Sequence, residues 1–177
     1  MKLTIAKIDF VKSLASVENI VEGKTTIPIL SNVLLEAKQG RLCLSATDMD
    51  MMISDKVKVK NIDIEGSTSV PAHILYNVIK ELNEDKPIEL SYDESNKKLH
   101  LSSFKSKFTF SCLPKDEFPI LSTENYKISF LLSSNVLKEM IDQTYFAISS
   151  EESRYYLNGI FFHTVKLNNK FFLRSIA

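Results

Sequence analysis

Hydrophobic and polar residues alternate at the start of the chain and then change to a helical spacing. Leu3 and Ile5 alternate with polar positions, which is typical of a half-buried strand. From Asp9 onward the apolar residues share one helical stripe: Phe10, Val11, Leu14, Val17, Ile20 and Val21. An extended connector then leads to Pro28, because the residue before a proline is kept out of the helical region. The pattern predicts a strand, an amphipathic helix and a connector.

Alternation returns after this connector and predicts a largely antiparallel sheet. The expected strands cover residues 32–37, 41–47, 50–59, 67–70, 87–92, 98–103 and 107–112, with a tight turn at Gln39 and Gly40. A second helix follows Pro71, and its apolar stripe is Ile74, Leu75, Val78, Ile79 and Leu82. We therefore expect an α+β fold in which two helices cover one face of an antiparallel sheet.

The order of elements then begins again, which indicates an internal repeat. A strand over residues 127–132, a cap at Ser133 and Ser134, a second-copy helix and strands over residues 157–167 and 170–176 follow one another. The first copy continues beyond Asp48, whereas the second ends at Ala177. We expect one complete domain over residues 1–123 and the start of a second domain over residues 124–177.

Composition narrows the possible partners and compartments. Twenty-two basic residues balance twenty-two acidic ones, so any binding of a polyanion must be local. The amino terminus lacks the basic start and long apolar run of a secretory signal, and no stretch approaches the ~18–20 apolar residues of a membrane span. Cys43 and Cys112 lie in alternating segments, which favours buried free thiols over a disulfide or a metal site. These features predict a cytoplasmic protein that does not bind membranes.

Catalytic and metal-binding motifs are not apparent. The three histidines, His73, His100 and His163, do not accompany a serine or cysteine nucleophile in a known motif. A small hydrolase using His73 or His163 is the enzyme alternative. Asp48, Asp50 and Asp55 lack the glycine and closing glutamate of a calcium loop, so solvated or turn-capping carboxylates are expected. We predict no catalytic residues, no metal and no cofactor.

Arg154, Tyr155 and Tyr156 form the most specific candidate binding motif. A guanidinium beside two phenols, following the third helix and a polar loop, could supply one phosphate contact and two stacking planes to nucleic acid. Alternatively, one tyrosine covers the sheet and the arginine pairs with a nearby glutamate.

Lysines on the helices form a second candidate surface. Lys12 and Lys80 lie off the apolar stripes of the first two helices, Lys138 lies near the border of the third, and Lys24 follows the first helix. Such residues could follow a phosphate backbone without reading bases. Their alternative role is that of ordinary solvated lysines.

Aromatic residues near the end of the first unit form a third cluster. Alternation is expected to place Phe104, Phe108 and Phe110 on one face of a strand, with Lys105 and Lys107 on the other. An aromatic stripe of this kind belongs to the core by default. If the strand is a sheet edge, part of the cluster would suit subunit pairing.

Several motifs, taken in order, resemble those of the bacterial DNA polymerase III beta subunit family, the sliding clamps. They are Met1-Lys2-Leu3-Thr4-Ile5, Thr26-Ile27-Pro28-Ile29-Leu30-Ser31-Asn32, Ala46-Thr47-Asp48, Val70-Pro71-Ala72, Leu113-Pro114 with Phe118-Pro119, and Arg154-Tyr155-Tyr156-Leu157-Asn158-Gly159. The resemblance implies a DNA clamp fold of repeated domains and a head-to-tail ring of two subunits with three domains each. Helices would line the DNA hole, and the protein would be a non-catalytic processivity factor.

The resemblance also implies roles for single residues. Lys24, Tyr155 and Tyr156 match DNA-contacting positions, and Lys12, Lys80 and Lys138 match basic positions on hole-lining helices. Phe108 and Phe110, flanked by Lys105 and Lys107, match the edge that pairs with another subunit. Leu157 matches one wall of a peptide pocket, of which the remaining walls, with the rest of the second domain and all of the third, are not in this sequence.

Partners follow from the same resemblance. They are double-stranded DNA bound without sequence preference, the polymerase III catalytic subunit, the clamp loader, and other clamp-binding polymerases and repair proteins. A full-length chain would form a homodimer. The competing hypothesis is a peptide-binding scaffold with no direct DNA role.

Overall fold

The computed structural model describes residues 1–21, 26–83, 85–120 and 130–177, and only the backbone of Glu152. The chain divides into two compact units, Met1–Ser122 and Thr123–Ala177.

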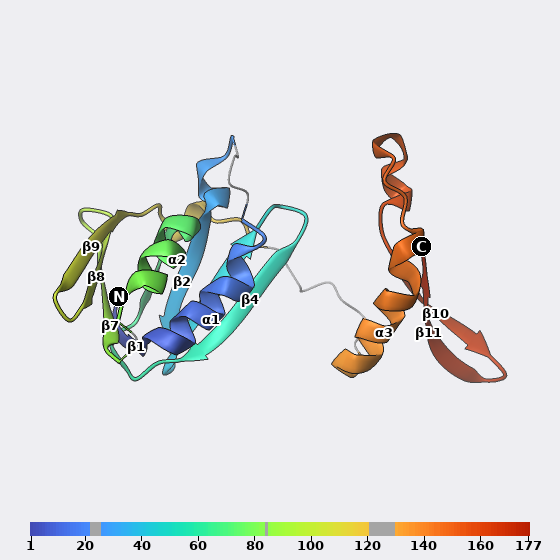
Figure 1. Ribbon diagram of the computed structural model, residues 1–177, viewed down its shortest axis with the longest axis horizontal. Helices are drawn as coiled ribbons and strands as arrows, with labels where there is room; N and C mark the ends of the chain where they lie inside the picture. The colour runs from blue at the N-terminus through green and yellow to red at the C-terminus, as the bar shows by residue number, and fades with distance from the viewer. Residues whose placement is uncertain (22–25, 84, 121–129) are drawn as a thin grey trace. The chain divides into compact units, whose positions relative to one another are not determined.

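Two α-helices and nine strands make up the described part of the first unit (Figure 1). In chain order they are β1 (Lys2–Ala6), α1 (Lys7–Glu18), the 3-10 turn η1 (Pro28–Ser31), β2 (Asn32–Lys38), β3 (Arg41–Thr47), β4 (Met52–Lys58), β5 (Asn61–Ile64), β6 (Gly66–Pro71), α2 (Ala72–Glu81), β7 (Pro87–Asp93), β8 (Lys98–Ser103), β9 (Ser106–Ser111) and the 3-10 turn η2 (Lys115–Glu117). The α+β class expected from the sequence is confirmed.

The strands form two antiparallel sheets rather than the single sheet expected from the pattern. One sheet has the order β5-β1-β7-β8-β9 and the other the order β4-β3-β2-β6. Strand β5 was not predicted, and it pairs with β1 through Leu3 and Ile62. Its four residues are mostly exposed and include Asp63, so alternation gives little signal there.

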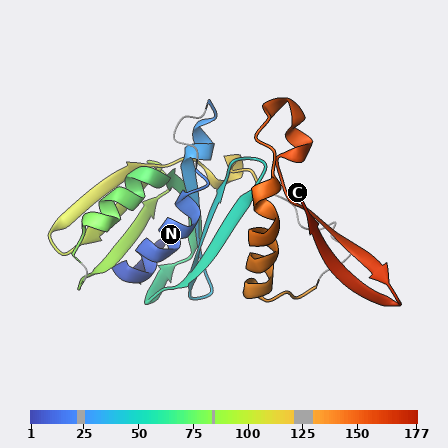
Figure 2. The ribbon, with the colours of Figure 1, turned by 45° about the vertical axis from the view of Figure 1, so that its right-hand side comes forward.

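Helices α1 and α2 lie side by side over one face of the strands, as Figures 1 and 2 both show. Phe10 and Leu14 of α1 and Leu75 and Ile79 of α2 are fully buried. Together with the inward side chains of both sheets, including Leu90, they form one continuous core. Burial of each such side chain contributes about 1.5–3 kcal/mol, so the two amphipathic stripes fix the helix layer.

A buried lysine joins the two helices. The Nζ atom of Lys7 donates to the carbonyl oxygens of Lys80 (2.9 Å) and Leu82 (2.5 Å), and Lys7 is buried. These carbonyls lie at the carboxyl end of α2, where a helix lacks intrahelical partners and favours a positive charge. At the opposite end of the helix pair, His73 of α2 contacts the Glu18 carboxylate of α1. The backbone of Lys80 is therefore held in place by α1.

The tight turn predicted at Gln39 and Gly40 is confirmed. Both residues have positive φ angles, 51° and 72°, and they join β2 to β3 in an antiparallel hairpin. Glycine adopts this region without a steric penalty, and paired left-handed residues match the twist of a hairpin.

The second unit contains one α-helix and one hairpin among its described residues. Its elements are α3 (Ser134–Thr144), the 3-10 turns η3 (Tyr145–Ala147) and η4 (Glu152–Leu157), and the paired strands β10 (Phe161–Leu167) and β11 (Lys170–Ile176). The Ser133 hydroxyl accepts a hydrogen bond from the Val136 backbone N–H (3.3 Å), which confirms the predicted cap. None of the described residues of this unit is buried, so its apolar side chains are accessible to a partner.

Two boundaries in the second unit differ from the prediction. The hairpin of β10 and β11 begins at Phe161, because residues 152–157 turn in a 3-10 helix with a kink at Arg154 (φ −121°, ψ 51°). The strand expected over residues 127–132 lies partly outside the described residues, and Phe130–Leu132 are not in a strand.

Both cysteines are free, as predicted. Cys112 is buried, and this burial raises the pKa of its thiol. Cys43 on β3 is only half-buried, so the expectation of two buried thiols holds fully for Cys112 alone. Of the helices in the described ranges, none is long and apolar enough to cross a membrane.

Candidate nucleic-acid interface

The helix layer of the first unit carries two of the predicted cationic side chains. Lys12 on α1 and Lys80 in the last turn of α2 are both exposed. The Lys80 ammonium lies 5.5 Å from the centre of the Tyr76 ring, a cation–π distance. Because the Lys7 ammonium also holds the Lys80 backbone, the Lys80 side chain projects from a rigid backbone.

Acidic groups near Lys12 are partly occupied by hydrogen bonds. The Asp55 carboxylate of β4 accepts hydrogen bonds from the hydroxyls of Ser13 and Ser16 on α1, the second at 3.3 Å. Lys12, Asp9 and Asp55 line one shallow hollow beside this contact. The helix layer is thus a surface of mixed charge rather than a strongly basic patch.

Lys138 on α3 lies in a different local environment. Its ammonium pairs with the Asp142 carboxylate one helical turn later, and both side chains are mostly exposed. Exposed pairs at this spacing contribute only about 0.3–0.5 kcal/mol, so a phosphate could compete for the ammonium. Lys24, the fourth predicted cation, lies outside the described residues.

The Arg154-Tyr155-Tyr156 motif lies on the exposed turn η4. Tyr155 and Tyr156 are 80% and 71% exposed, and their rings meet edge to face with centroids 5.9 Å apart. Arg154 Nε lies 3.3 Å from the Glu151 carboxylate. The arginine therefore pairs with a glutamate, as the alternative interpretation expected, but neither tyrosine covers the sheet. Two aromatic planes remain accessible for stacking.

Asn158 organises this turn, and the sequence pattern did not reveal it. In the amide orientation that satisfies its neighbours, the side-chain nitrogen donates to the carbonyl oxygens of Ser149 (2.9 Å), Glu151 (3.3 Å) and Arg154 (3.3 Å). The Ser149 backbone N–H also donates to the Leu157 carbonyl (3.1 Å). A single side chain thus ties together the loop that presents the aromatic pair. An asparagine beside a glycine is a turn signal, but its three acceptors are known only from the fold.

Leu157, the predicted pocket wall, is 43% exposed at the end of η4. Its role in peptide binding stays a prediction.

The aromatic cluster of the first unit is divided between turn, edge and core. β9 is an edge of its sheet, as subunit pairing would require. Phe110 is buried in the core, whereas Phe108 is 37% exposed. In subunit pairing, Phe108 would make the contact and Phe110 would support it from the core. The expectation that Phe104 shares their strand face is wrong, because Phe104 and Lys105 form the turn before β9, where Phe104 has a φ of 51°.

Charged side chains surround this exposed turn. The ammonium groups of Lys86 and Lys105 lie 5.8 and 5.5 Å from the centre of the Phe104 ring, which is 70% exposed. Lys107 on β9 is exposed. The edge thus presents an aromatic ring with cations around it, and its pairing role stays a prediction.

Among the described residues, the histidines do not pair with a serine or cysteine nucleophile. His73 contacts Glu18, and His100 Nδ1 lies 3.0 Å from the Thr109 hydroxyl. His163 stacks on Phe161 with ring centroids 5.0 Å apart. None of the three contacts a serine hydroxyl or a cysteine thiol within the described ranges, which leaves the hydrolase alternative without a supporting geometry.

Acidic residues after β3 cap a turn. Asp48 accepts hydrogen bonds from the backbone N–H groups of Asp50 (3.0 Å) and Met51 (2.7 Å), which confirms its predicted capping role. In the part of the chain open to description, no three histidine, cysteine or acidic side chains gather as metal ligands.

Comparison with known proteins decides the family. The family described as DNA polymerase III beta subunit, N-terminal domain, matches residues 1–122. The chain belongs to this family. The beta sliding clamp of Caulobacter vibrioides (strain NA1000 / CB15N) is 41% identical over 177 residues, all of this chain and 47% of that protein. The beta sliding clamp of Pseudomonas aeruginosa is 33% identical over the same 177 residues.

Solved structures of the beta subunit family agree with this assignment. A DNA polymerase sliding clamp from Caulobacter crescentus matches 99% of this chain and 47% of its own, with a TM-score of 0.91 and 40% identity. A sliding clamp from Bartonella birtlesii, solved bound to griselimycin, matches 99% of this chain and 46% of its own, with a TM-score of 0.91 and 42% identity. The chain spans about half the length of the relatives it matches, and its fold is that of the DNA clamp.

Proposed function

We propose that this chain provides the first DNA-facing part of a sliding clamp, a processivity factor that encircles duplex DNA. The observation that carries the proposal is the match along the whole chain to relatives named beta sliding clamp. Residues 1–123 would form the first clamp domain and residues 124–177 the start of the second. The working unit would be a head-to-tail ring of two full-length chains in the cytoplasm, without catalytic residues.

Charge and topology support a sliding role in physical terms. Each phosphate that a lysine neutralises adds binding free energy through counterion release, and sequence-independent motion must overcome this binding. The chain has no net charge, and the helix layer offers scattered cations rather than a dense patch. We expect Lys12, Lys80, Lys138, Lys24, Arg154, Tyr155 and Tyr156 to make weak contacts that guide the duplex while the ring retains it.

Proteins that act on DNA would be the partners of this ring. They are the polymerase III catalytic subunit, the clamp loader, and other polymerases and repair proteins that bind clamps. The exposed Leu157 would contribute one wall of their peptide pocket. The Phe108 edge, with Phe110 behind it and Lys105 and Lys107 beside it, would pair with the other subunit.

Retention on circular DNA tests this function. The protein to be tested is a chimera in which this sequence replaces the aligned residues of the Caulobacter vibrioides clamp. It is loaded on nicked circular duplex DNA by that organism's clamp loader. We expect the chimera to remain with the circle during gel filtration and to fall to background after the circle is cut once, because a ring slides off an end. The unaltered Caulobacter clamp is the matched control.

The peptide-binding scaffold makes the opposite prediction. A scaffold would bind polymerase peptides but would not stay on circular DNA, or its retention would not change when the circle is cut. Either result would reject the sliding function while leaving the fold assignment intact.

A further inference from the structure

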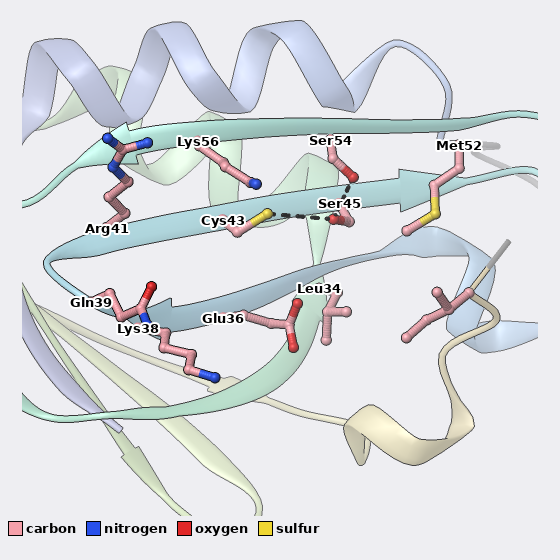
Figure 3. A pocket seen from close by; sticks show the side chains of 11 residues that line it. Leu34, Glu36, Lys38, Gln39, Arg41, Cys43, Ser45, Met52, Ser54 and Lys56 are labelled. Atoms are coloured by element: carbon pink, nitrogen blue, oxygen red, sulfur yellow. Dashed lines mark hydrogen bonds between the residues drawn. The ribbon is translucent and has the colours of Figure 1, made fainter. Parts of the chain in front are cut away.

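The outer face of the sheet β4-β3-β2, on the side away from the helices, contains a hollow of about 690 Å³ (Figure 3). Most of its side chains come from alternate positions of the three strands and therefore point to this face, and Gln39 of the turn and Ile120 complete the lining. The floor includes Ser45, whose hydroxyl lies 2.8 Å from the Ser54 hydroxyl and 3.9 Å from the Cys43 sulfur. This hollow belongs wholly to the first unit and is separate from the helix layer.

The pairing of β2, β3 and β4 places several cationic residues together at one end of this face. Lys38 of β2 is directly opposite Arg41 of β3, which is directly opposite Lys58 of β4. In the next row, Glu36 and Lys56 lie on either side of β3. Like charges that face each other across strands destabilise a sheet, so this arrangement is unfavourable unless an anion lies near it.

The described residues do not provide that anion at contact distance. Among the residues that the structure describes, none of these four cationic groups lies within 4 Å of a carboxylate. The Glu65 carboxylate accepts a hydrogen bond from the Gln39 backbone N–H (2.8 Å) instead. Glu36 is the one acidic side chain in the lining, so the hollow carries a net positive charge.

The opposite end of the hollow is apolar. Leu34, Met52 and Ile120 line it, and Ile120 is 67% exposed. Leu34 and Met52 pack on the small core cluster around Phe118, which makes this end firm. The hollow therefore changes from cationic to apolar along the strand direction.

We propose that this face binds an extended segment of a partner protein that carries acidic residues followed by an apolar residue. Lys38 and Leu34 are four residues apart on one strand, which corresponds to about 13 Å at 3.3 Å per residue. An extended peptide with a carboxylate and an aliphatic side chain at the same separation would reach both ends at once. The acidic residues would face Lys38, Arg41 and Lys56, and the aliphatic side chain would lie on Leu34, Met52 and Ile120.

The same features disfavour nucleic acid as the ligand of this face. The Glu36 carboxylate interrupts the positive field between the two ends. The apolar end is aliphatic, whereas strands of nucleic acid are held by aromatic side chains on which bases stack. A carboxylate peptide satisfies the cations and also buries the aliphatic end.

Fluorescence anisotropy of the 177-residue chain with a dansylated peptide tests the proposal. The peptide has three consecutive glutamates and a leucine four residues after the last of them. We expect saturable binding that weakens at high salt, since part of it is electrostatic. The Lys38→Glu, Arg41→Glu double variant should weaken binding at least tenfold. The matched control, Lys97→Glu with Lys98→Glu, changes the same charge on the other sheet and should bind as the original chain does.

Cys43 provides a second readout that does not depend on a variant's folding. Its thiol is half-buried within the hollow, whereas Cys112 is buried in the core. The bound peptide should slow the reaction of Cys43 with a maleimide and leave Cys112 unchanged.

Four outcomes would overturn the proposal. They are no saturable binding, equal binding of a peptide with glutamines in place of the glutamates, equal loss in the control variant, and tighter binding of a duplex or single-stranded oligonucleotide to this face. Self-association that disappears in the Lys38→Glu, Arg41→Glu variant would instead assign the face to a second copy of the chain. None of these results affects the circular-DNA test, because that test concerns the helix layer on the opposite face.

Discussion

Substitution of Phe10 by alanine is expected to lower the free energy of unfolding of the first unit by about 3–5 kcal/mol. The Phe10 ring is fully buried where α1 meets the core of both sheets. Its removal forfeits the transfer free energy of the ring and leaves a cavity that the closely packed neighbours cannot fill. Urea unfolding followed by circular dichroism measures the effect.

Phe104→Ala is the matched control for this loss. The Phe104 ring is 70% exposed in the turn before β9 and contacts the ammonium groups of Lys86 and Lys105. Its removal should cost no more than about 1 kcal/mol, the value of exposed cation–π contacts. Equal losses for Phe10→Ala and Phe104→Ala would contradict the burial on which the helix layer depends.

Removal of the two exposed lysines of the helix layer, Lys12 and Lys80, should have the largest effect on DNA binding. For the Lys12→Ala, Lys80→Ala double variant, we expect affinity for a short linear duplex to fall about 10–100-fold at about 50 mM salt. The slope of log affinity against log salt should become shallower by about 2, one unit for each phosphate that is no longer neutralised. Titration of the 177-residue chain at several salt concentrations measures both quantities.

Lys38→Ala with Arg41→Ala provides a control of equal charge. These two residues belong to the same unit but point to the sheet face away from the helices. Their removal should leave the salt slope unchanged. An equal change in slope for both double variants would mean that net charge, rather than the helix layer, governs DNA binding.

Local pattern was sufficient to predict the helices and most strands of the first unit. The stripes of α1 and α2 place Phe10, Leu14, Leu75 and Ile79 on buried faces, and period alone reveals such stripes. The division into two sheets could not be predicted in this way. It depends on β1 pairing with both β5 and β7, through contacts such as Leu3 with Ile62 and with Leu90, which are far apart in the sequence.

The candidate site was predictable in residue type but less so in geometry. The sequence indicates that Arg154, Tyr155 and Tyr156 are suited to bind nucleic acid, but the kinked 3-10 turn and the Asn158 contacts that expose the rings depend on the folded loop. The alternating pattern predicts Phe104 on the same strand face as Phe108 only if the strand is unbroken between them. A left-handed residue at Phe104 breaks that strand, and bulky residues adopt this conformation rarely.

Crosslinking to DNA is the most direct test of which surface faces the duplex. A photoreactive group is attached to single cysteines placed at Lys12, Lys80 or Lys38 in the chimera with Cys43→Ser and Cys112→Ala, loaded on nicked circular DNA. We expect crosslinks from positions 12 and 80 on the helix layer, and none above background from position 38 on the outer sheet. Crosslinks from position 38 with none from positions 12 and 80 would contradict a helix layer that faces the duplex.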